Sequence, residues 1–483
     1  MAPWTARRLP HALVLLVLAI LSTHTLALDV SDDAVDNVAR RSPVLGVPLQ
    51  RRNPRRHLTE DEYGAWAQRQ VEYLRAKYGG TSSEDKRAIG TAGLANQNTD
   101  STFYASVGFG TPLEQYNLIL DTGSADTWIA GADCTTGCDG VKRFAANASS
   151  TFRDQNRPFT VHYGSASARG SLGRDVVQMA GFEVQDQLFA LVESVTSNKP
   201  LLHSPVSGLM GLAFRGIAAS GGMPFWLRLA NGGVFDRPMM SFCLTRFLDV
   251  DGASALEPGG YFTLGGVNSS LYSGDIDFVP LPDEGQTYWE LPLKTFSVNG
   301  ATIPLANDST SDAAIDTGTT LIGAPTAIID QMMTHIPGSF SGQDEYEAYF
   351  MYPCNSSVQV QFSFGSRLWT VGPRDFKLIE FSNGTCVSSF FRLSPGSSSP
   401  KWIIGDTFLK TVYSVFQYDP PAIGFATLSK TALELSTVGG ELPRPSQGAS
   451  VVITGASSPR IAHPVLSSLF GLSFFIFYIL LTL

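Results

Sequence analysis

A short motif that occurs twice constrains this chain more than any other feature. An apolar run ends in Asp-Thr-Gly and a hydroxyl residue at positions 118–124, and again at positions 314–320. An apolar run of this length predicts a buried strand, so each copy delivers its aspartate at a strand end. The glycine lets the backbone turn sharply and expose N–H groups to the carboxylate, and the hydroxyl can bond an outer carboxylate oxygen. The motif residues are Asp121, Thr122, Gly123 and Ser124 in the first copy and Asp316, Thr317, Gly318 and Thr319 in the second.

The spacing of the two aspartates predicts two similar lobes. Asp121 and Asp316 are 195 residues apart (316 minus 121), which is about one domain length. If a pseudo-twofold axis brings their carboxyl groups together, both cannot ionise, and one pKa rises strongly. The pair would share a proton, one group acting as base and the other as acid. It could then activate water against a peptide carbonyl without a metal, a cofactor or a covalent intermediate. Two ordinary strand-to-turn junctions are the alternative, but chance seldom repeats a motif with the same flanks.

Both motifs resemble those of the pepsin-like aspartic proteases, and the resemblance covers about residues 98–429. It implies an all-β fold of two β-rich lobes with the active-site cleft between them. Asp121 and Asp316 would be the catalytic aspartates, supported by the other motif residues. It also implies an aspartic endopeptidase with an acid optimum, acting on extended polypeptides. The 46 Gly and 28 Pro residues favour many turns and short strands, in keeping with a β-rich body.

Residues 161–165 resemble the flap of that family, a hairpin that closes over substrate. The resemblance assigns Tyr163, Gly164 and Ser165 to substrate binding, and Trp128 to a hydrogen bond with Tyr163. The tyrosine ring can exclude water, and Gly164 lets the flap backbone approach a peptide that binds like an added strand. Some relatives that cleave after Lys or Arg carry an acid at the position of Ser165, so the serine argues against a basic preference.

The cysteines fit disulfide pairing in an oxidising compartment. The spacing of Cys134 and Cys138 matches a short disulfide of the family beside the active site, and Cys354 and Cys386 match its second-lobe disulfide. A zinc pair is the alternative for Cys134 and Cys138, but no partner ligands lie nearby in the sequence. Cys243 is then a buried free thiol that acts as a small hydrophobe, with an interchain disulfide as the alternative.

Two further stretches resemble the strands that cross beneath the active-site loops of the family. These are residues 208–213 and 402–406, in which a glycine follows apolar residues and permits close packing. Asp406 could be mistaken for a third catalytic acid, but its place in this framework strand indicates a structural role. The boundary between the lobes is expected near residues 270–285, giving an N-terminal lobe over 88–275 and a C-terminal lobe over 276–429.

The first 27 residues predict a secretory signal peptide. Arg7 and Arg8 precede the apolar run of residues 13–21, and small residues at 25–27 suit cleavage. A membrane anchor is the alternative, but the run is short for a bilayer. Secretion places the chain in an oxidising and glycosylating route.

Five Asn-x-Ser/Thr sites then predict N-glycans on exposed loops, at Asn147, Asn268, Asn307, Asn355 and Asn383.

Residues 28–87 read as a pro-segment that keeps the enzyme a zymogen. Six arginines and no acid lie between Arg40 and His57, whereas the whole chain carries a net charge of −9. A capping box at 59–62 opens a stretch with apolar residues at helical spacing. We expect this basic segment to cover the acidic body, and acid pH to release it by protonating carboxylates. Lys77-Tyr78 is a candidate for the pair that reaches the aspartates, and Lys86-Arg87 suits a processing protease. A solvated, disordered arm is the alternative.

The C-terminal region predicts attachment to a membrane surface. Residues 430–457 are rich in Gly, Ser, Pro and Thr, as in a stalk, and residues 458–483 end in an apolar run with no basic residue behind it. Gly455, followed by two more small residues, suits a glycolipid anchor site, and the fungal surface proteases called yapsins resemble this layout. A retained transmembrane helix is the alternative, although it would lack the usual cytoplasmic Lys and Arg.

These features predict a surface-anchored aspartic endopeptidase of the secretory pathway, held at the cell surface or released from it. The expected partners are polypeptide substrates, its own pro-segment and a membrane through the glycolipid anchor, and we expect a monomer. The acidic balance argues against nucleic acid. The sequence contains no His-Glu-x-x-His, Gly-x-Ser-x-Gly or Walker motif. A catalytically inactive peptide-binding or cell-wall protein on the same fold is the alternative.

Overall fold

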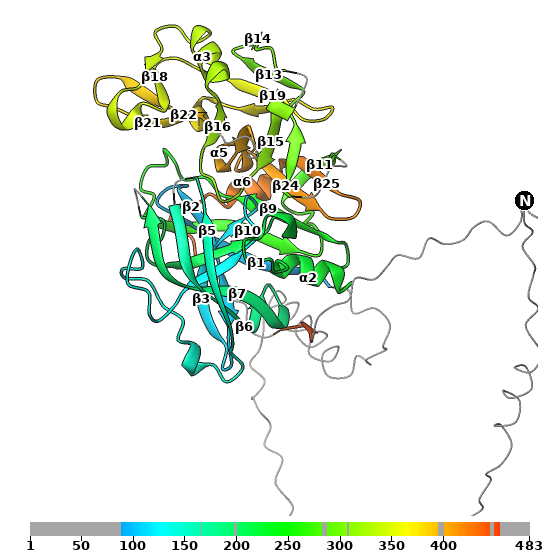
Figure 1. The fold of residues 1–483 in the computed structure, drawn as a ribbon. Coiled ribbons are helices and arrows are strands. Elements are labelled where there is room, and N and C mark those ends of the chain that lie inside the picture. Colours follow the sequence, from blue (N-terminus) through cyan, green and yellow to red (C-terminus); the bar gives the residue numbers. More distant parts are fainter. Residues whose placement is uncertain are drawn as a thin grey trace, which may run out of the picture. The chain divides into compact units, whose positions relative to one another are not determined.

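A computed structural model describes residues 88–454 except 165, 198–199, 283–286, 307–308, 395–399 and 445–448. The signal peptide, the pro-segment and the hydrophobic C-terminus expected from the sequence therefore lie outside the described residues. The chain divides into two units, residues 1–81 and 82–483, and the description concerns the second alone. Its described residues are mostly strands, as predicted for a bilobal, all-β fold (Figure 1). Among them, no helix combines the length and apolar character needed to cross a bilayer.

The first lobe is built on one large twisted sheet. Its strands are β1 (Gly90–Gln97), β2 (Thr102–Phe109), β3 (Glu114–Asp121), β4 (Thr127–Ala130), β5 (Arg153–His162), β6 (Ala166–Met179), β7 (Phe182–Ser197), β8 (Val206–Gly211), β9 (Met239–Leu244) and β10 (Leu256–Leu264). The short helices are η1 (Ala146–Ala148), η2 (Arg215–Ile217) and α2 (Phe225–Asn231). Strands β4 and β8 are wholly buried, and β3 is buried over its last four residues, where the apolar run that precedes the aspartate lies.

The second lobe contains an 8-stranded and a 4-stranded sheet. Its strands are β11 (Tyr272–Pro280), β12 (Glu290–Pro292), β13 (Thr295–Val298), β14 (Ala301–Thr302), β15 (Asp312–Ile315), β16 (Ile322–Pro325), β17 (Phe340–Ser341), β18 (Tyr349–Pro353), β19 (Val360–Ser363), β20 (Trp369–Val371), β21 (Lys377–Glu380), β22 (Thr385–Leu393), β23 (Trp402–Ile404), β24 (Val412–Gln417) and β25 (Ala422–Leu428). Its helices are η3 (Ser309–Ser311), α3 (Thr326–Thr334), η4 (Asp344–Tyr346), α4 (Pro373–Phe376) and α5 (Asp406–Leu409).

The two lobes repeat one strand arrangement around the motifs. In the first lobe β3 pairs parallel with β8, β8 antiparallel with β4, and β4 parallel with β7. In the second, β15 pairs parallel with β23, β23 antiparallel with β16, and β16 parallel with β22. The strand that ends at Asp121 thus has its counterpart in the strand that ends just before Asp316. The repeated motif in the sequence reflects a repeated unit of structure.

The closing strands do not stay within the second lobe. β24 pairs with β9, and β25 joins β24 to β11, so these late strands extend the 14-stranded sheet of the first lobe. The sequence-based boundary near residues 270–285 does not show this return. The two halves are therefore connected by continuous backbone hydrogen bonds as well as by side-chain packing.

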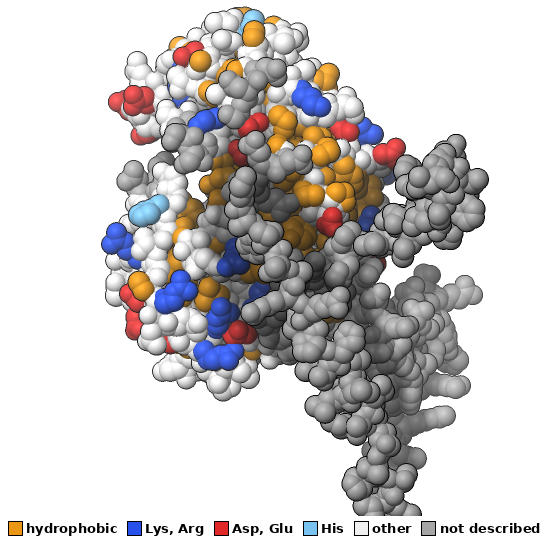
Figure 2. All heavy atoms as spheres, turned by 45° about the vertical axis from the view of Figure 1, so that its right-hand side comes forward, with side chains coloured by type: hydrophobic (Ala, Val, Ile, Leu, Met, Phe, Trp, Pro, Cys, Tyr) orange, Lys and Arg blue, Asp and Glu red, His pale blue; other side chains and the backbone are white. Residues whose placement is uncertain are grey.

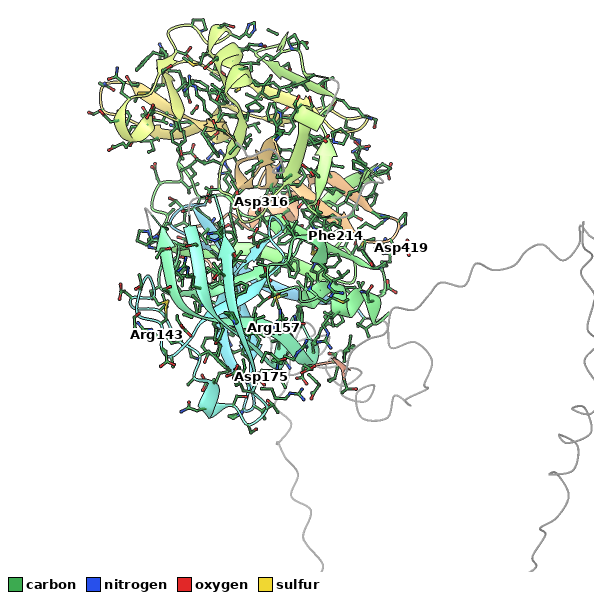
Figure 3. The ribbon with its side chains drawn as sticks, viewed as in Figure 1. Arg143, Arg157, Asp175, Phe214, Asp316 and Asp419 are labelled. Carbon is green, nitrogen blue, oxygen red and sulfur yellow. A yellow bond between two sulfur atoms is a disulfide. The ribbon has the colours of Figure 1, made fainter. Side chains whose placement is uncertain are left out.

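Aromatic side chains fill the interior beneath the motifs. Phe214, labelled in Figure 3, lies with its ring centroid 4.4 Å from that of Trp289. The Trp289 indole donates to the Leu212 carbonyl at 2.9 Å, and the Trp226 indole to the Ala213 carbonyl at 3.1 Å. Buried indole N–H groups need such partners. These contacts tie the residues just after β8 to both lobes, and β8 lies directly beside the Asp121 strand.

The segment after β25 packs on the body where it is described. The sequence predicts a stalk over residues 430–457, but residues 430–434 form α6 (Lys430–Glu434) and residues 451–453 form β26 (Val451–Ile453). β26 pairs parallel with β7, and Val451 and Ile453 are buried while Val452 is exposed. The composition suggested a stalk, but the alternation of buried and exposed residues is that of a strand edge.

Candidate active site

The structure brings Asp121 and Asp316 together. Asp121 ends β3 and Asp316 directly follows β15, and both side chains are buried, with 6% and 8% of their surface exposed. Figure 3 marks Asp316 where the two lobes meet. Each carboxyl group packs against the glycine that follows the other aspartate in its motif, and the charge of Asp316 contributes to raising the pKa of Asp121. Two carboxyl groups from distant parts of the chain therefore share one buried site.

Each carboxyl group is held by the same pair of donors. The backbone N–H of Gly123 donates to Asp121 Oδ1 at 2.8 Å, and that of Gly318 donates to Asp316 Oδ1 at 2.8 Å. The Ser124 hydroxyl donates to Asp121 Oδ2 at 2.5 Å. The Thr319 hydroxyl makes the equivalent bond to Asp316 Oδ2 at 2.7 Å. The local symmetry extends to individual atoms, as the repeated sequence requires.

The threonines of the two motifs lock the loops to each other. The backbone N–H of Thr122 donates to Thr317 Oγ1 at 3.1 Å, and that of Thr317 donates to Thr122 Oγ1 at 2.9 Å. Each hydroxyl in turn donates to the strand that carries the opposite aspartate, Thr122 to the Ile315 carbonyl at 2.8 Å and Thr317 to the Leu120 carbonyl at 2.7 Å. All four bonds cross between lobes, so the relative position of the carboxyl groups is fixed by the backbone.

The motif glycines serve a different purpose from the one expected. The sequence suggested that glycine is needed for a sharp turn, but neither Gly123 nor Gly318 has a positive φ angle. A Cβ on Gly123 would lie 2.5 Å from Asp316 Cγ, and a Cβ on Gly318 would lie 2.3 Å from Asp121 Oδ1. Each glycine is therefore required because the opposite carboxyl group packs against it. The exposure of their N–H groups to the carboxylates agrees with the expectation.

A strand with its own close-packed glycine crosses beneath each loop. Gly211 pairs with Asp121 in the parallel register of β8 and β3, and a Cβ there would lie 2.5 Å from the Ala125 backbone. A Cβ on Gly405, which follows β23, would lie 2.0 Å from the Thr319 carbonyl oxygen. Leu212 N–H donates to the Asp121 carbonyl at 2.7 Å. These contacts support both loops from below, as the sequence comparison of residues 208–213 with 402–406 implied.

Burial raises the pKa of Asp121 well above its usual range, and the negative charge of Asp316 raises it further. The Ser124 and Gly123 hydrogen bonds oppose this shift without cancelling it. A carboxyl pair of this kind titrates as a unit, so it keeps one proton at a pH where isolated carboxyl groups are ionised. One acid and one base can therefore be present in the same site.

Asp406 and Lys410 place further charge close to this pair. Asp406 begins α5 beneath the second loop, where its N–H donates to the Thr319 carbonyl at 2.8 Å. Burial raises the pKa of Asp406 well above normal, and the Asp316 charge adds to the effect. Lys410, also buried, lies 2.8 Å from Asp100 and 3.7 Å from Asp375. Asp406 therefore lies in the framework, as expected, where the charge of Asp316 acts on it.

The sequence reading missed the ion cluster around Lys410. Burial tends to raise the pKa of Asp100, but Lys410, Asn96 and the Leu248 N–H together lower it below normal. The available signal was a lysine four residues after Asp406 in an otherwise apolar stretch, since buried charges almost always have partners. The identity of those partners, contributed by both lobes, could not be read from the chain.

The flap tyrosine and its predicted partner are in contact. Trp128 Nε1 donates to the Tyr163 hydroxyl at 2.7 Å, and the Tyr163 ring packs against the buried cluster that contains Trp128. Burial raises the pKa of Tyr163, as does the charge of Asp121, so the phenol stays protonated. Gly164 is exposed, and a Cβ added there would meet nothing within 4 Å. Ser165 lies outside the described residues.

Both expected disulfides are present. Cys134 is joined to Cys138 and Cys354 to Cys386, while Cys243 is a buried free thiol. Glu380 lies near the second pair, but sulfurs in a disulfide are not available to bind metal.

Of the predicted glycosylation sites, Asn147, Asn355 and Asn383 are exposed and Asn268 is half-buried. Asn307 and the anchor site Gly455 lie outside the described residues.

Comparison with known proteins gives a consistent result. The family model described as eukaryotic aspartyl protease matches residues 102–428. The chain is 37% identical over 425 residues to major aspartyl peptidase 1 of Cryptococcus neoformans var. grubii, covering 81% of this chain and 86% of that protein. It is 30% identical over 351 residues to pepsin A of Canis lupus familiaris, covering 72% and 86%. It is 32% identical over 349 residues to an aspartic protease of Phaffia rhodozyma, covering 71% and 80%.

The raised pKa of Asp121 predicts a stability effect of Asp121→Asn. A carboxyl group whose folded-state pKa is raised stabilises the fold below its unfolded pKa, and this contribution is lost as pH rises toward the folded-state value. Asparagine cannot ionise, so the variant should match the wild type in acid and be more stable at neutral pH. The measurement is the free energy of unfolding across this pH range.

Asp344→Asn is the matched control, because Asp344 is exposed and has a φ of 51°, which asparagine tolerates. Its stability should follow the wild type at every pH. If Asp121→Asn also followed the wild type throughout, the carboxyl groups would not be coupled as described.

Proposed function

Because the chain belongs to the eukaryotic aspartyl protease family and is an aspartic endopeptidase, we propose that Asp121 and Asp316 are its catalytic pair. The observation that carries this assignment is that two buried carboxyl groups each have the same two donors and each pack against the glycine of the opposite motif. The remaining motif residues, Thr122, Gly123, Ser124, Thr317, Gly318 and Thr319, hold the pair in position.

The reaction needs one proton shared by the pair. The ionised carboxylate accepts a proton from a water molecule as the water oxygen attacks the peptide carbonyl carbon. The protonated carboxyl group donates to the carbonyl oxygen, which gives a neutral tetrahedral diol. The carboxyl group that took the proton from water then donates it to the leaving nitrogen, while the now ionised carboxylate accepts a proton from a hydroxyl of the diol. The C–N bond breaks, and the new carboxylic acid and amine depart with one proton left on the pair. The pair is thereby returned to its starting state.

The hydroxyl and N–H donors at each carboxyl group keep its oxygens oriented during this exchange. Ser124 and Thr319 donate to the Oδ2 atoms, so they stabilise whichever carboxylate is charged. Proton transfer from water requires the two carboxyl groups to reach one solvent molecule, and positioning of this kind is a large part of catalysis. The four threonine bonds between the loops supply that positioning.

Tyr163 and Gly164 are proposed to close over the substrate, together with Ser165. The Tyr163 hydroxyl is held by Trp128, which leaves the ring to shield the reacting groups from bulk water. An extended peptide of several residues can then pair with the exposed flap backbone at Gly164. No metal or cofactor enters this scheme.

An acid optimum follows from the shared proton. As pH rises, the pair loses its last proton and can no longer donate to the carbonyl oxygen, so the rate should fall.

Asp121→Asn and Asp316→Asn should each abolish peptide hydrolysis, because either variant lacks one of the two groups. Gly123→Ala should reduce the rate by about a hundredfold, since small displacements of reacting groups are costly.

Gly372→Ala is the control for the glycine variant, because a Cβ at Gly372 would meet nothing within 4 Å and its φ is −81°. It should retain wild-type activity toward a denatured protein substrate. Undiminished hydrolysis by either asparagine variant would contradict the assignment of the pair.

The enzyme is also proposed to be a zymogen held inactive by residues 28–87. The arginine-rich stretch 40–57 supports this, because it is basic and the remainder of the chain is acidic. Its attraction to ionised carboxylates should weaken as acid protonates them. The segment added in trans should therefore inhibit the mature enzyme near neutral pH and much less in acid.

A segment in which the six arginines of the stretch 40–57 are replaced by glutamine is the matched inhibitor control and should inhibit weakly at both pH values. Equal inhibition by the natural segment at neutral and acid pH, or none at either, would favour a solvated arm.

Secretion, N-glycosylation at Asn147, Asn268, Asn307, Asn355 and Asn383, and a glycolipid anchor at Gly455 are proposed from the sequence. The exposure of three of these asparagines is compatible with glycans. A phosphatidylinositol-specific phospholipase should release the protein from membranes, and replacing residues 455–457 with bulky side chains should prevent its anchoring. If the lipase frees a control anchored protein but not this one, a retained helix is favoured.

A further inference from the structure

The first lobe contains a pocket lined by three arginines, apart from the catalytic pair and the flap. It encloses about 260 Å³, and its charged lining residues are Arg174, Arg215, Arg228 and Asp186. These four residues define what we call the arginine pocket. Arg174 lies on β6, Asp186 on β7, Arg215 in η2 and Arg228 on α2, so four separate elements converge on it. Figure 2 shows several Lys and Arg side chains on the lower part of the face in view.

One carboxylate faces several guanidinium groups here. Asp186 Oδ2 accepts from Arg174 at 3.2 Å, and Asp186 Oδ1 accepts from Arg153 at 2.5 Å. The Asp186 main-chain carbonyl accepts from Arg174 at 3.1 Å and from Arg228 at shorter range. Arg215 Nε donates to the Gly221 carbonyl at 3.2 Å. The lining therefore carries three positive charges against one negative charge.

The backbone brings these like charges together. Arg153 on β5 lies directly opposite Arg174 on β6, and like charges in such a cross-strand pair are unfavourable. Burial lowers the pKa of Arg228; the Asp186 charge opposes that shift, and Arg174 adds to it. Arg157, labelled in Figure 3, donates to the Ser220 carbonyl at 3.3 Å and ties down the loop that forms one wall. The fold thus holds several arginine side chains close together, and a bound anion would reduce the repulsion between their positive charges.

We propose that the arginine pocket binds a phosphate group. The planar guanidinium fork matches the geometry of phosphate oxygens and can bind two of them at once. The lining has a net charge of two positive units, three arginines against Asp186, and a phosphate monoester carries about −1.5 to −2 at neutral pH. A lone carboxylate would leave much of this charge unneutralised. The volume admits a phosphate with part of the group that carries it.

The position of β26 favours a lipid headgroup as the source of that phosphate. Ile453 pairs with Val184 on β7, two residues before Asp186, and β26 runs parallel to β7 toward the pocket. Ile453 also packs against Gly232, at the end of the helix that carries Arg228. The described chain therefore ends beside the strand that carries Asp186. If the C-terminal segment is anchored as proposed above, the pocket faces a membrane surface; phosphate binding itself does not depend on the anchor.

The test measures binding of inorganic phosphate and of vesicles to the mature chain. Arg174→Gln and Arg215→Gln should each weaken phosphate binding about tenfold, the typical effect of losing one charge-assisted hydrogen bond. Asp186→Asn should tighten it, because the variant removes the acid that faces the three lining arginines; general damage to the fold would not produce this reversal. Arg374→Gln, which removes an exposed arginine of the second lobe, should bind phosphate as the wild type does.

The vesicle measurement compares phosphatidylcholine alone with phosphatidylcholine mixed with phosphatidic acid, whose headgroup is a phosphate monoester, so that the C-terminal membrane attachment contributes equally to both. Preference for the anionic vesicles that falls in Arg174→Gln and Arg215→Gln would identify a headgroup as the ligand. Phosphate binding without such preference would support the pocket and identify a soluble phosphate compound. The proposal is overturned if phosphate binding is absent, or is unchanged in the arginine variants and in Asp186→Asn while unfolding midpoints show that all are folded.

Discussion

Four hydrogen bonds between Thr122 and Thr317 and the facing strands hold two mutually repelling acids in contact. Each threonine receives a bond from the backbone of the other and donates to the strand beneath the other aspartate. Because both partners of every bond are buried, separating the loops would leave polar groups unsatisfied, which is costly. These four hydrogen bonds fix the spacing of the carboxyl groups. That close spacing contributes to the raised pKa of Asp121 and leaves room only for glycine at positions 123 and 318.

Several further acidic residues lie in the interior around these hydrogen bonds, and basic residues from both lobes pair with them. Asp406 lies beneath the second loop, and Lys410, one helical turn later, contacts Asp100 from the turn between β1 and β2. Asp375 completes the cluster with Arg246 at 3.0 Å. Thr320 donates to the Ser101 carbonyl at 2.7 Å and connects the second loop to the same turn. The electrostatic environment of the pair therefore depends on residues distributed over the whole chain.

Much of the site could be predicted from the sequence because its signals are local. Asp-Thr-Gly after an apolar run specifies a strand, an acid and a close contact within seven residues, and its repetition indicates two equivalent lobes. The Trp128 to Tyr163 contact was accessible through resemblance alone. The purpose of Gly123 was not, because the atom that excludes a side chain there belongs to Asp316, far away in the chain.

Other features were not predicted from the sequence because they depend on contacts between residues that are far apart in the chain. The return of β24 to β9 cannot be inferred from either strand alone. The stalk prediction for residues 430–457 rested on their Gly, Ser, Pro and Thr content, and the short apolar run at residues 451–453 was not recognised as a strand. The arginine pocket was invisible for the same reason, since its lining comes from separate strands and helices of one lobe.

The central claim is that Asp121 and Asp316 share one proton and one solvent molecule. Neutron diffraction of the mature enzyme in acid, after exchange into deuterated water, observes both directly. The account predicts one deuteron on the carboxyl pair and a single water within hydrogen-bonding distance of both groups. Two fully ionised carboxylates, or two groups that contact different waters, would contradict it.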